Sequence, residues 1–276
     1  MANIEELKSE LHTTKTLRTI TGAYSDVSAL RIVGLKKAFE QNSLFYEQIS
    51  QLYHAVRISE HFRQIKDDRP LKPKTLHMAF TSNQHFYGNI NRSIMEEFFS
   101  ETENSSNDRL VIGITGKEYC QANTKSSGYS FLVFESETPT KEEEQYILRV
   151  CDEYDRVFVY YPKFITMLTQ VADRKDITFA PTPTFRHQRE IKYIFEPELP
   201  KLLAFFRHQI RSVLFSQVIL ESILARTATR LVSMDTAEKK AEEKIREFER
   251  IIRTGQQASL NSALIETIIW RTKQYA

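Results

Sequence analysis

The sequence predicts an α/β protein with long helices: an antiparallel coiled coil of the N- and C-terminal helices plus a small open α/β domain. Two counts support this. All eight prolines lie between Pro70 and Pro200, and 276 residues include only seven glycines, well under half of the average glycine usage of about 7%. Inside a helix, proline costs about 3 kcal/mol and glycine about 1 kcal/mol. Residues 1–69 and 201–276, which lack proline, therefore predict two long helices.

These breaks divide the chain into three segments. We expect an N-terminal coiled-coil helix over 1–68, a small α/β domain over 69–195, and a C-terminal coiled-coil helix over 196–276. A helix of about 75 residues is roughly 110 Å long, whereas a compact globule of this size has a radius of gyration of roughly 19 Å. Such a helix needs a partner for its apolar stripe, and the other terminal helix is the simplest one.

The C-terminal segment carries the clearer seam. Between Leu203 and Ile252, most positions reached by alternating steps of three and four are apolar, as in a coiled coil. Mixed charges lie between them and predict a solvated face. The seam residues that we expect to carry the packing are Leu224, Leu231, Met234, Ile245, Phe248 and Ile252.

The N-terminal segment is less regular. We expect its apolar stripe to begin near Ile4, to continue after a slip in phase at Leu17, and to resume further on at Leu44. The residues assigned to it are Ile4, Leu7, Leu11, Leu17, Ile20, Tyr24, Val27, Leu44, Ile49, Leu52 and Val56.

The middle segment alternates apolar runs with helical patterns, which predicts a small open, Rossmann-like sheet. Thr140 precedes three glutamates and is a predicted helix N-cap. The expected strands are 76–83, 109–114, 129–134, 156–161 and 191–195, with a hairpin-like pair over 164–170 and 176–179; the expected helices are 89–99 and 141–154.

Motifs of catalysis are scarce in this segment. The run Gly113–Glu118 lacks the spacing of a phosphate-binding loop and has Glu where the magnesium-binding hydroxyl belongs, so we interpret it as a strand-to-helix turn. His77 and His85 show no metal-ligand spacing, and Cys120 and Cys151 are expected to be buried thiols. We therefore assign no catalytic, cofactor-binding or metal-binding residue.

The charge balance excludes further classes. Lys plus Arg is 38 and Asp plus Glu is 36, a net charge of +2, without the basic excess of a protein bound mainly through nucleic-acid phosphates. No apolar run approaches the roughly 20 residues of a membrane-spanning helix.

Several segments match one family, most clearly in the C-terminal third. The matching stretches are Tyr193–Pro197, Ser216–Arg226, Ala225–Ala237, Gln257–Leu260, Lys163–Val171 and Thr81–Asn91. In their order along the chain they resemble segments of the gamma subunit of F-type ATP synthases, and the resemblance runs essentially from end to end.

The resemblance implies a non-catalytic central-stalk rotor. The terminal helices would turn inside a ring of three alpha and three beta subunits, and an epsilon-type subunit and a membrane c-ring would bind the α/β domain. The subunit would couple proton-driven rotation to ATP synthesis or hydrolysis at its partners, as a peripheral part of a complex on the cytoplasmic face of a bacterial membrane. Matched positions imply rotor–stator contacts at Thr21, Tyr24, Gln256, Gln257, Asn261 and Ser262.

Departures from the family pattern keep alternatives open. Gln256 replaces a basic residue, and Asn261–Ala263 replaces a polar T-Q-E run. A gamma-like subunit of a specialised non-synthase rotary ATPase is one alternative. An unrelated coiled-coil scaffold explains the heptads, and an α/β enzyme with helical arms would need a site that the sequence does not offer.

Overall fold

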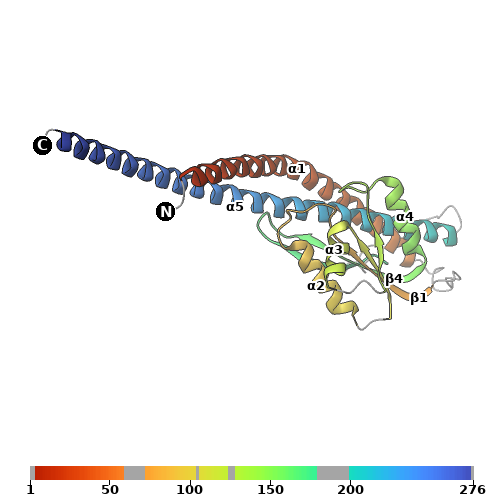
Figure 1. The fold of residues 1–276 in the computed structure, drawn as a ribbon. Helices are drawn as coiled ribbons and strands as arrows, with labels where there is room; N and C mark the ends of the chain where they lie inside the picture. Colours follow the sequence, from red (N-terminus) through yellow and green to blue (C-terminus); the bar gives the residue numbers. More distant parts are fainter. Residues whose placement is uncertain (1–3, 59–71, 104–105, 124–127, 179–198, 275–276) are drawn as a thin grey trace. The chain divides into compact units, whose positions relative to one another are not determined.

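The computed structural model describes residues 4–58, 72–103, 106–123, 128–178 and 199–274. Within these residues, two long helices, α1 (Ile4–Ile58) and α5 (Leu199–Gln274), accompany a five-stranded sheet and three shorter helices (Figure 1). Contacts divide the chain into two compact units, which we call the helical pair (residues 1–29 and 231–276) and the α/β unit (residues 30–230). The predicted fold class is confirmed, whereas the predicted boundaries at 68/69 and 195/196 lie outside the described residues.

The sheet has the strand order β3-β2-β1-β4-β5. Its strands are β1 (Lys72–Phe80), β2 (Asp108–Ile112), β3 (Ser130–Leu132), β4 (Tyr154–Phe164) and β5 (Gln170–Asp176). β1 pairs in parallel with both β2 and β4, β3 pairs in parallel with β2, and β5 runs antiparallel to β4. The chain thus moves outward from β1 on one side and returns with β4 on the other, so the strand order reverses between β1 and β4.

The predicted strand over 164–170 is wrong. β4 continues through Pro162 to Phe164, and residues 165–169 form the turn into β5. Pro162 pairs with Ala172 of β5 but lies beyond Tyr160, the last β4 residue in register with β1. It therefore has a neighbouring strand on one side only, where proline is tolerated. The predicted strand over 191–195 lies outside the described residues.

Side chains of β1 alternate between two hydrophobic cores, as the strand period requires. Met78 and Phe80 face a core shared with α1, α4 (Lys141–Asp152) and α5, whereas Ala79 faces a core shared with α2 (Ile90–Thr102) and α3 (Ile114–Ala122). Helices therefore cover both faces of the sheet, as parallel strands require.

Two local predictions are confirmed. Thr140 caps α4 in a capping box, in which its hydroxyl accepts from the Glu143 amide at 3.3 Å and the Glu143 carboxylate accepts from the Thr140 amide at 2.7 Å. Gly113 is the strand-to-helix turn before α3. Its φ of 105° and a Cβ position only 2.6 Å from Thr81 Oγ1 both require glycine.

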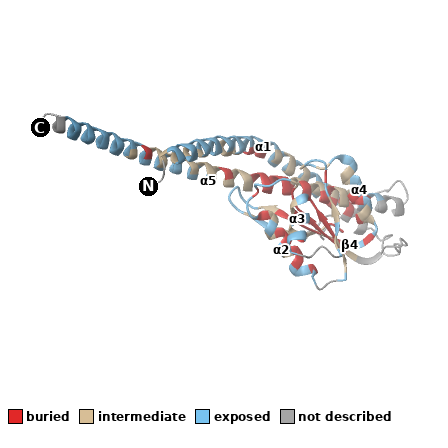
Figure 2. Cartoon of the chain, viewed as in Figure 1, coloured by how far each residue is buried: buried red, intermediate tan, exposed pale blue. Residues whose placement is uncertain are grey.

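In the helical pair, α1 and α5 run antiparallel. Ile4 lies against Gly255, Arg18 pairs with Glu242, and Gly22 lies beside Glu238, so positions rise on one helix as they fall on the other. Much of this unit is exposed or half-buried (Figure 2).

The predicted N-terminal stripe is wrong in its middle part. Leu17, Ile20, Tyr24 and Val27 are exposed, by 53%, 47%, 41% and 63%. The side turned away from solvent carries small or hydroxyl-bearing residues instead: Thr14, Thr21, Gly22, Ser25 and Ser28. The less exposed side of this part of α1 therefore carries small and hydroxyl-bearing residues in place of the predicted apolar ones.

Candidate functional site

The structure places the predicted α5 seam residues on the less exposed side of the helix. Leu224, in the α/β unit, is buried. In the helical pair Met234 and Ile252 are buried, and Leu231, Ile245 and Phe248 are half-buried. The positions between them, such as Lys239, Lys240, Glu243, Lys244, Arg246 and Glu247, are exposed. A stripe with this period is the geometry that a packed helix pair needs.

Ion pairs cross the helical pair at its exposed flank. Lys15 Nζ lies 2.8 Å from Glu249 Oε1, and Arg18 Nη2 lies 2.9 Å from Glu242 Oε1. Their side chains keep between about a third and a half of their exposure, so water screens them. Such pairs help to select the antiparallel register more than they add stability.

Beyond Gly255, α5 continues with every described side chain from Gln256 to Arg271 exposed. Leu260, Leu264 and Ile268 recur every four residues and hence share one helix face, and they are exposed by 66%, 61% and 63%. Trp270 is exposed by 66%. A continuous exposed apolar face of this kind marks an interaction surface.

Four of the six predicted contact residues, Gln256, Gln257, Asn261 and Ser262, lie exposed on this end of α5. Tyr24 is exposed on α1, and the Thr21 hydroxyl turns back to donate to the Leu17 and Arg18 carbonyls at 3.0 Å. The six therefore lie on two helices and do not meet in one site.

Sequence reasoning missed the apolar residues on this end of α5, namely Leu260, Leu264, Ile265, Ile268, Ile269 and Trp270. Leu260, Leu264 and Ile268 recur every four residues, and Ile265 and Ile269 are also four apart, which is a helical spacing that could have found them.

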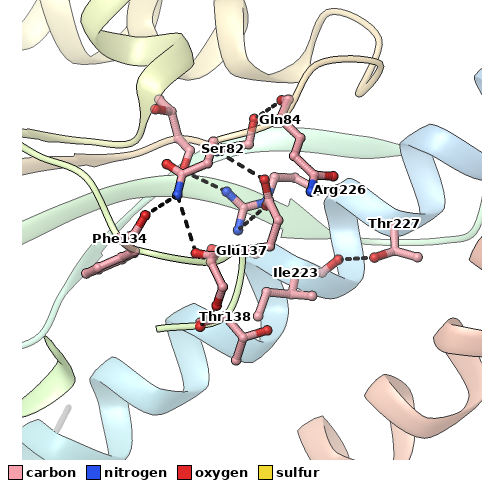
Figure 3. Close-up of polar contacts among 12 residues, drawn as sticks. Ser82, Gln84, Phe134, Glu137, Thr138, Ile223, Arg226 and Thr227 are labelled. Carbon is pink, nitrogen blue, oxygen red and sulfur yellow. Dashed lines mark hydrogen bonds and ion pairs between the residues drawn. The ribbon is translucent and has the colours of Figure 1, made fainter. Parts of the chain in front are cut away.

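A second feature lies at the carboxyl edge of the sheet (Figure 3). Arg226 of α5 is only 2% exposed, and its Nη1 donates to the Thr81 carbonyl at 2.7 Å. Its guanidinium lies over the Phe80 ring at 5.3 Å, and its Nη2 is 3.9 Å from Glu137 Oε2. Burial lowers the pKa of Arg226, and the Glu137 carboxylate opposes that shift.

Open α/β sheets bind ligands at the carboxyl ends of the strands, where the strand order reverses. Here that position lies between β1 and β4. Arg226 reaches Thr81, the residue that follows β1, and Glu137 accepts a hydrogen bond from the Asn83 amide at 3.1 Å. Side chains of the chain itself therefore occupy the end of β1 at this edge.

Three other titratable side chains of the α/β unit, those of His77, Cys120 and Cys151, are buried. His77 is bonded to Tyr160 Oη at 3.0 Å and to Asn107 Nδ2 at 3.3 Å, and burial lowers its pKa. Burial raises the pKa of the Cys120 thiol to about 11 and that of the Cys151 thiol to about 12, which makes both thiols unreactive. His85 lies on an exposed loop, 4.0 Å from Glu118.

The parts of the chain that the structure describes hold no cluster of three or more potential metal-ligating side chains and no helix apolar enough to cross a bilayer. A shallow pocket of about 370 Å³ lies between the loop after β1 and α3, beside Phe86, Asn91 and Thr115.

Comparison with known proteins identifies the family. The family model described as ATP synthase matches residues 3–269. Over 97% of the chain, 22% of residues are identical to the ATP synthase gamma chain of Desulforamulus reducens, covering 98% of that protein. The ATP synthase gamma chain of Geobacter sp. (strain M21) is 27% identical, with 97% of each chain covered.

Two solved structures share the fold. The central stalk and c-ring of the Tetrahymena thermophila mitochondrial ATP synthase includes a chain that aligns with a TM-score of 0.59 and 18% identity, covering 79% of this chain and 99% of that one. The Euglena gracilis mitochondrial ATP synthase includes one with a TM-score of 0.57 and 13% identity, covering 92% and 96%. The chain therefore belongs to the ATP synthase family, in which its relatives are gamma chains.

Proposed function

We propose that this chain is the central-stalk rotor subunit of a rotary F-type ATP synthase, coupling proton-driven rotation to ATP synthesis or hydrolysis at partner subunits. The observation that carries the proposal is the helical pair, in which α1 and α5 run antiparallel and α5 continues past Gly255 with an exposed apolar face. Helices satisfy their backbone hydrogen bonds internally, so a shaft made of them can turn within a ring without leaving polar groups unpaired.

The proposed partners are three alpha and three beta subunits around the shaft, an epsilon-type subunit, and a membrane c-ring. They follow from the family and from the similar chains of solved ATP synthases, whose structures include F1 and a c-ring. We place the assembly on the cytoplasmic face of the cell membrane, with this chain as a peripheral component.

We further propose that the chain contributes no catalytic residue and that its partners bind and hydrolyse ATP. Two observations support this. The buried Arg226 donates to the Thr81 carbonyl at the end of β1, an edge at which open α/β sheets bind ligands, and burial raises the pKa of both thiols well above neutrality.

The rotor–stator contacts that we propose are Thr21, Tyr24, Gln256, Gln257, Asn261 and Ser262, with the shaft held by the seam from Leu224 to Ile252. Exposure of Tyr24 and of the residues after Gly255 supports contact with a surrounding ring. Their neighbours Leu17, Ile20 and Val27 are exposed apolar residues that a ring would cover.

The proposal is tested by purifying the full chain with and without the alpha- and beta-type subunits from the same organism. We expect a stable complex that hydrolyses ATP, while the chain alone hydrolyses none. A chain that remains separate from such a ring, or that hydrolyses ATP by itself, contradicts the proposal. A parallel homodimer, detected by cross-linking two copies of an Ile245→Cys variant, would instead favour a coiled-coil scaffold.

The departures at Gln256 and Asn261–Ala263 favour a second candidate, a gamma-like subunit of a rotary ATPase that is not a synthase. Vesicles carrying the whole assembly separate the two. ATP synthesis driven by an imposed proton gradient supports the synthase, and hydrolysis-driven motion without any synthesis supports the specialised ATPase.

A further inference from the structure

Just over one turn of α5 bonds to several parts of the sheet's carboxyl edge. Arg226 donates to the Thr81 carbonyl at 2.7 Å, and Arg230 Nη2 donates to Gln84 Oε1 at 2.9 Å. The Thr229 hydroxyl shares its hydrogen between Gln170 Oε1 and the Ala225 carbonyl of α5, each at 3.0 Å. We call these three α5 residues the clamp turn. The groups that they hold lie just after β1 and at the start of β5, and they all belong to the α/β unit.

The groups that accept these bonds are themselves fixed. The Thr81 amide and hydroxyl both donate to the Ile112 carbonyl, at 2.9 and 2.6 Å, and Thr81 Oγ1 accepts from the Gly116 amide at 3.0 Å. Arg226 therefore holds an oxygen that is tied to β2 and α3.

The other two contacts are anchored in the same way. Gln170 Nε2 donates to the Thr166 and Met167 carbonyls at 2.8 and 3.0 Å, which locks the turn that Thr229 reaches. The Arg230 guanidinium also lies 4.0 Å from the centre of the Tyr87 ring, a cation–π contact. Each of the three side chains of the clamp turn therefore contacts a group of the α/β unit, and the groups that Arg226 and Thr229 contact make further hydrogen bonds of their own.

The clamp turn comprises the last α5 residues of the α/β unit, so it is suited to transmit torque along this helix. Arg230 is the last residue of the α/β unit, and α5 continues as one helix into the residues of the helical pair. Apolar packing is non-directional, whereas hydrogen bonds prefer particular angles. Arg226, Thr229 and Arg230 are spaced i, i+3 and i+4 and so share one face of α5. Three directional bonds from that face resist rotation of the helix about its own axis better than apolar contacts do.

We propose that Arg226, Thr229 and Arg230 are positioning residues that lock α5 against rotation relative to the sheet, so that torque passes between the α/β unit and the shaft at this turn. The proposal rests on the proposed rotor function. It gives the buried arginine a task that core packing does not explain, since a desolvated charge is a costly way to fill a core.

The test uses the full chain assembled with its alpha and beta partners, with the ring immobilised and a probe on an exposed α2 cysteine introduced as Ser100→Cys. The main variant is Arg226→Met combined with Glu137→Gln, which removes both members of the buried charge pair and keeps similar volumes. The matched control is Arg211→Met. Arg211 is another α5 arginine, bonded to Asp152 and to the Cys151 carbonyl at 2.7 and 2.9 Å, and it lies roughly 22 Å earlier along the helix.

We expect the variance of the probe angle in the stalled complex to rise about twofold in the Arg226→Met, Glu137→Gln variant, because a directional restraint is lost. Proton pumping per ATP should fall, while ATP hydrolysis by the soluble complex stays at the parent rate. The Arg211→Met control should match the parent in all three measurements, although its melting temperature falls.

Parent-like angular variance and pumping in the main variant would overturn the clamp. If that variant fails to fold, Thr229→Val with Arg230→Gln removes the two more exposed bonds and should raise the variance by a smaller amount; no rise would again overturn the proposal. Failure of the parent chain to join the ring is a different result, since it contradicts the rotor function and is seen before any variant is compared.

Discussion

The packing inside the α/β unit differs from the packing inside the helical pair. In the α/β unit, Met78, Phe98 and Phe215 are completely buried, and two hydrophobic cores cover both faces of the sheet. Among the residues of the helical pair whose burial the structure describes, Ser28 is the most buried on α1, and on α5 only Met234 and Ile252 are as little as 8% exposed. Dense packing stabilises the α/β unit, whereas a narrow stripe of buried residues stabilises the helical pair.

This difference suits the proposed division of labour. A unit that binds partners and receives torque benefits from a stiff core, because packed interiors transmit strain. A helical pair that turns inside a ring gains part of its stability from the ring and can leave apolar residues such as Leu17 and Leu264 exposed in the isolated chain.

The largest expected effect is in the α/β core. Replacing Phe98 by Ala should lower the free energy of unfolding of that unit by about 3–5 kcal/mol, since the ring is fully buried and leaves a cavity. Denaturant unfolding measures the loss. Phe248→Ala is the matched change in the helical pair, where the ring is half-buried, and it should cost clearly less. Equal losses would remove the distinction between the units.

A charge in the seam should have the next largest effect. Ile245→Asp replaces a half-buried apolar residue by a carboxylate and should destabilise the helical pair by about 1–3 kcal/mol. Far-UV circular dichroism during heating follows the loss of helix.

The matched control for Ile245→Asp is Leu264→Asp, which changes a residue that is 61% exposed on the same helix. It should leave the melting curve of the isolated chain unchanged and weaken only assembly with the ring. A seam without a structural role would make the two variants melt alike.

The junction of α5 with the sheet predicts a pH effect. Burial raises the pKa of Glu221, whose Oε2 accepts a hydrogen bond from Tyr161 at 3.1 Å. A raised carboxyl pKa means that the folded state favours the protonated form. This contribution to stability is complete below the unfolded pKa of about 4.3 and is lost as pH rises through the folded pKa.

Glu221→Gln tests this prediction, because the amide does not titrate. The stability deficit of the variant relative to the parent should shrink as pH rises from about 4 to about 7. Urea unfolding at several pH values measures it. A deficit that grows with pH would mean that Lys175, which favours the Glu221 carboxylate electrostatically, outweighs burial.

The smallest expected effect is at the flank of the helical pair. A double-mutant cycle of Arg18→Gln and Glu242→Gln should give a coupling energy below about 1 kcal/mol, because both side chains remain well exposed to water. The coupling should decrease further as salt is added. A large coupling that salt does not change would show that ion pairs, and not the seam, hold this unit together.

Particular residues show which parts of the fold could be predicted from the sequence and which could not. The absence of proline and the scarcity of glycine predicted α1 and α5, and the Thr140–Glu143 capping box predicted the start of α4, because these signals act within a few residues. The end of β4 was missed because the tolerance of Pro162 depends on how far β1 extends beside it. No local pattern records that distance.

Local sequence alone determined the two long helices, the alternation of strands and helices between them, and the resemblance to gamma chains, since helix breakers, caps and side-chain periods act over short stretches. Only the tertiary structure decided which face of α1 meets α5, where Ser28 and Gly22 took the place expected for Leu17 and Tyr24. Only it placed Arg226 against Thr81, across 145 residues of sequence. Both outcomes depend on the size and charge of side chains that become neighbours only when the chain has folded.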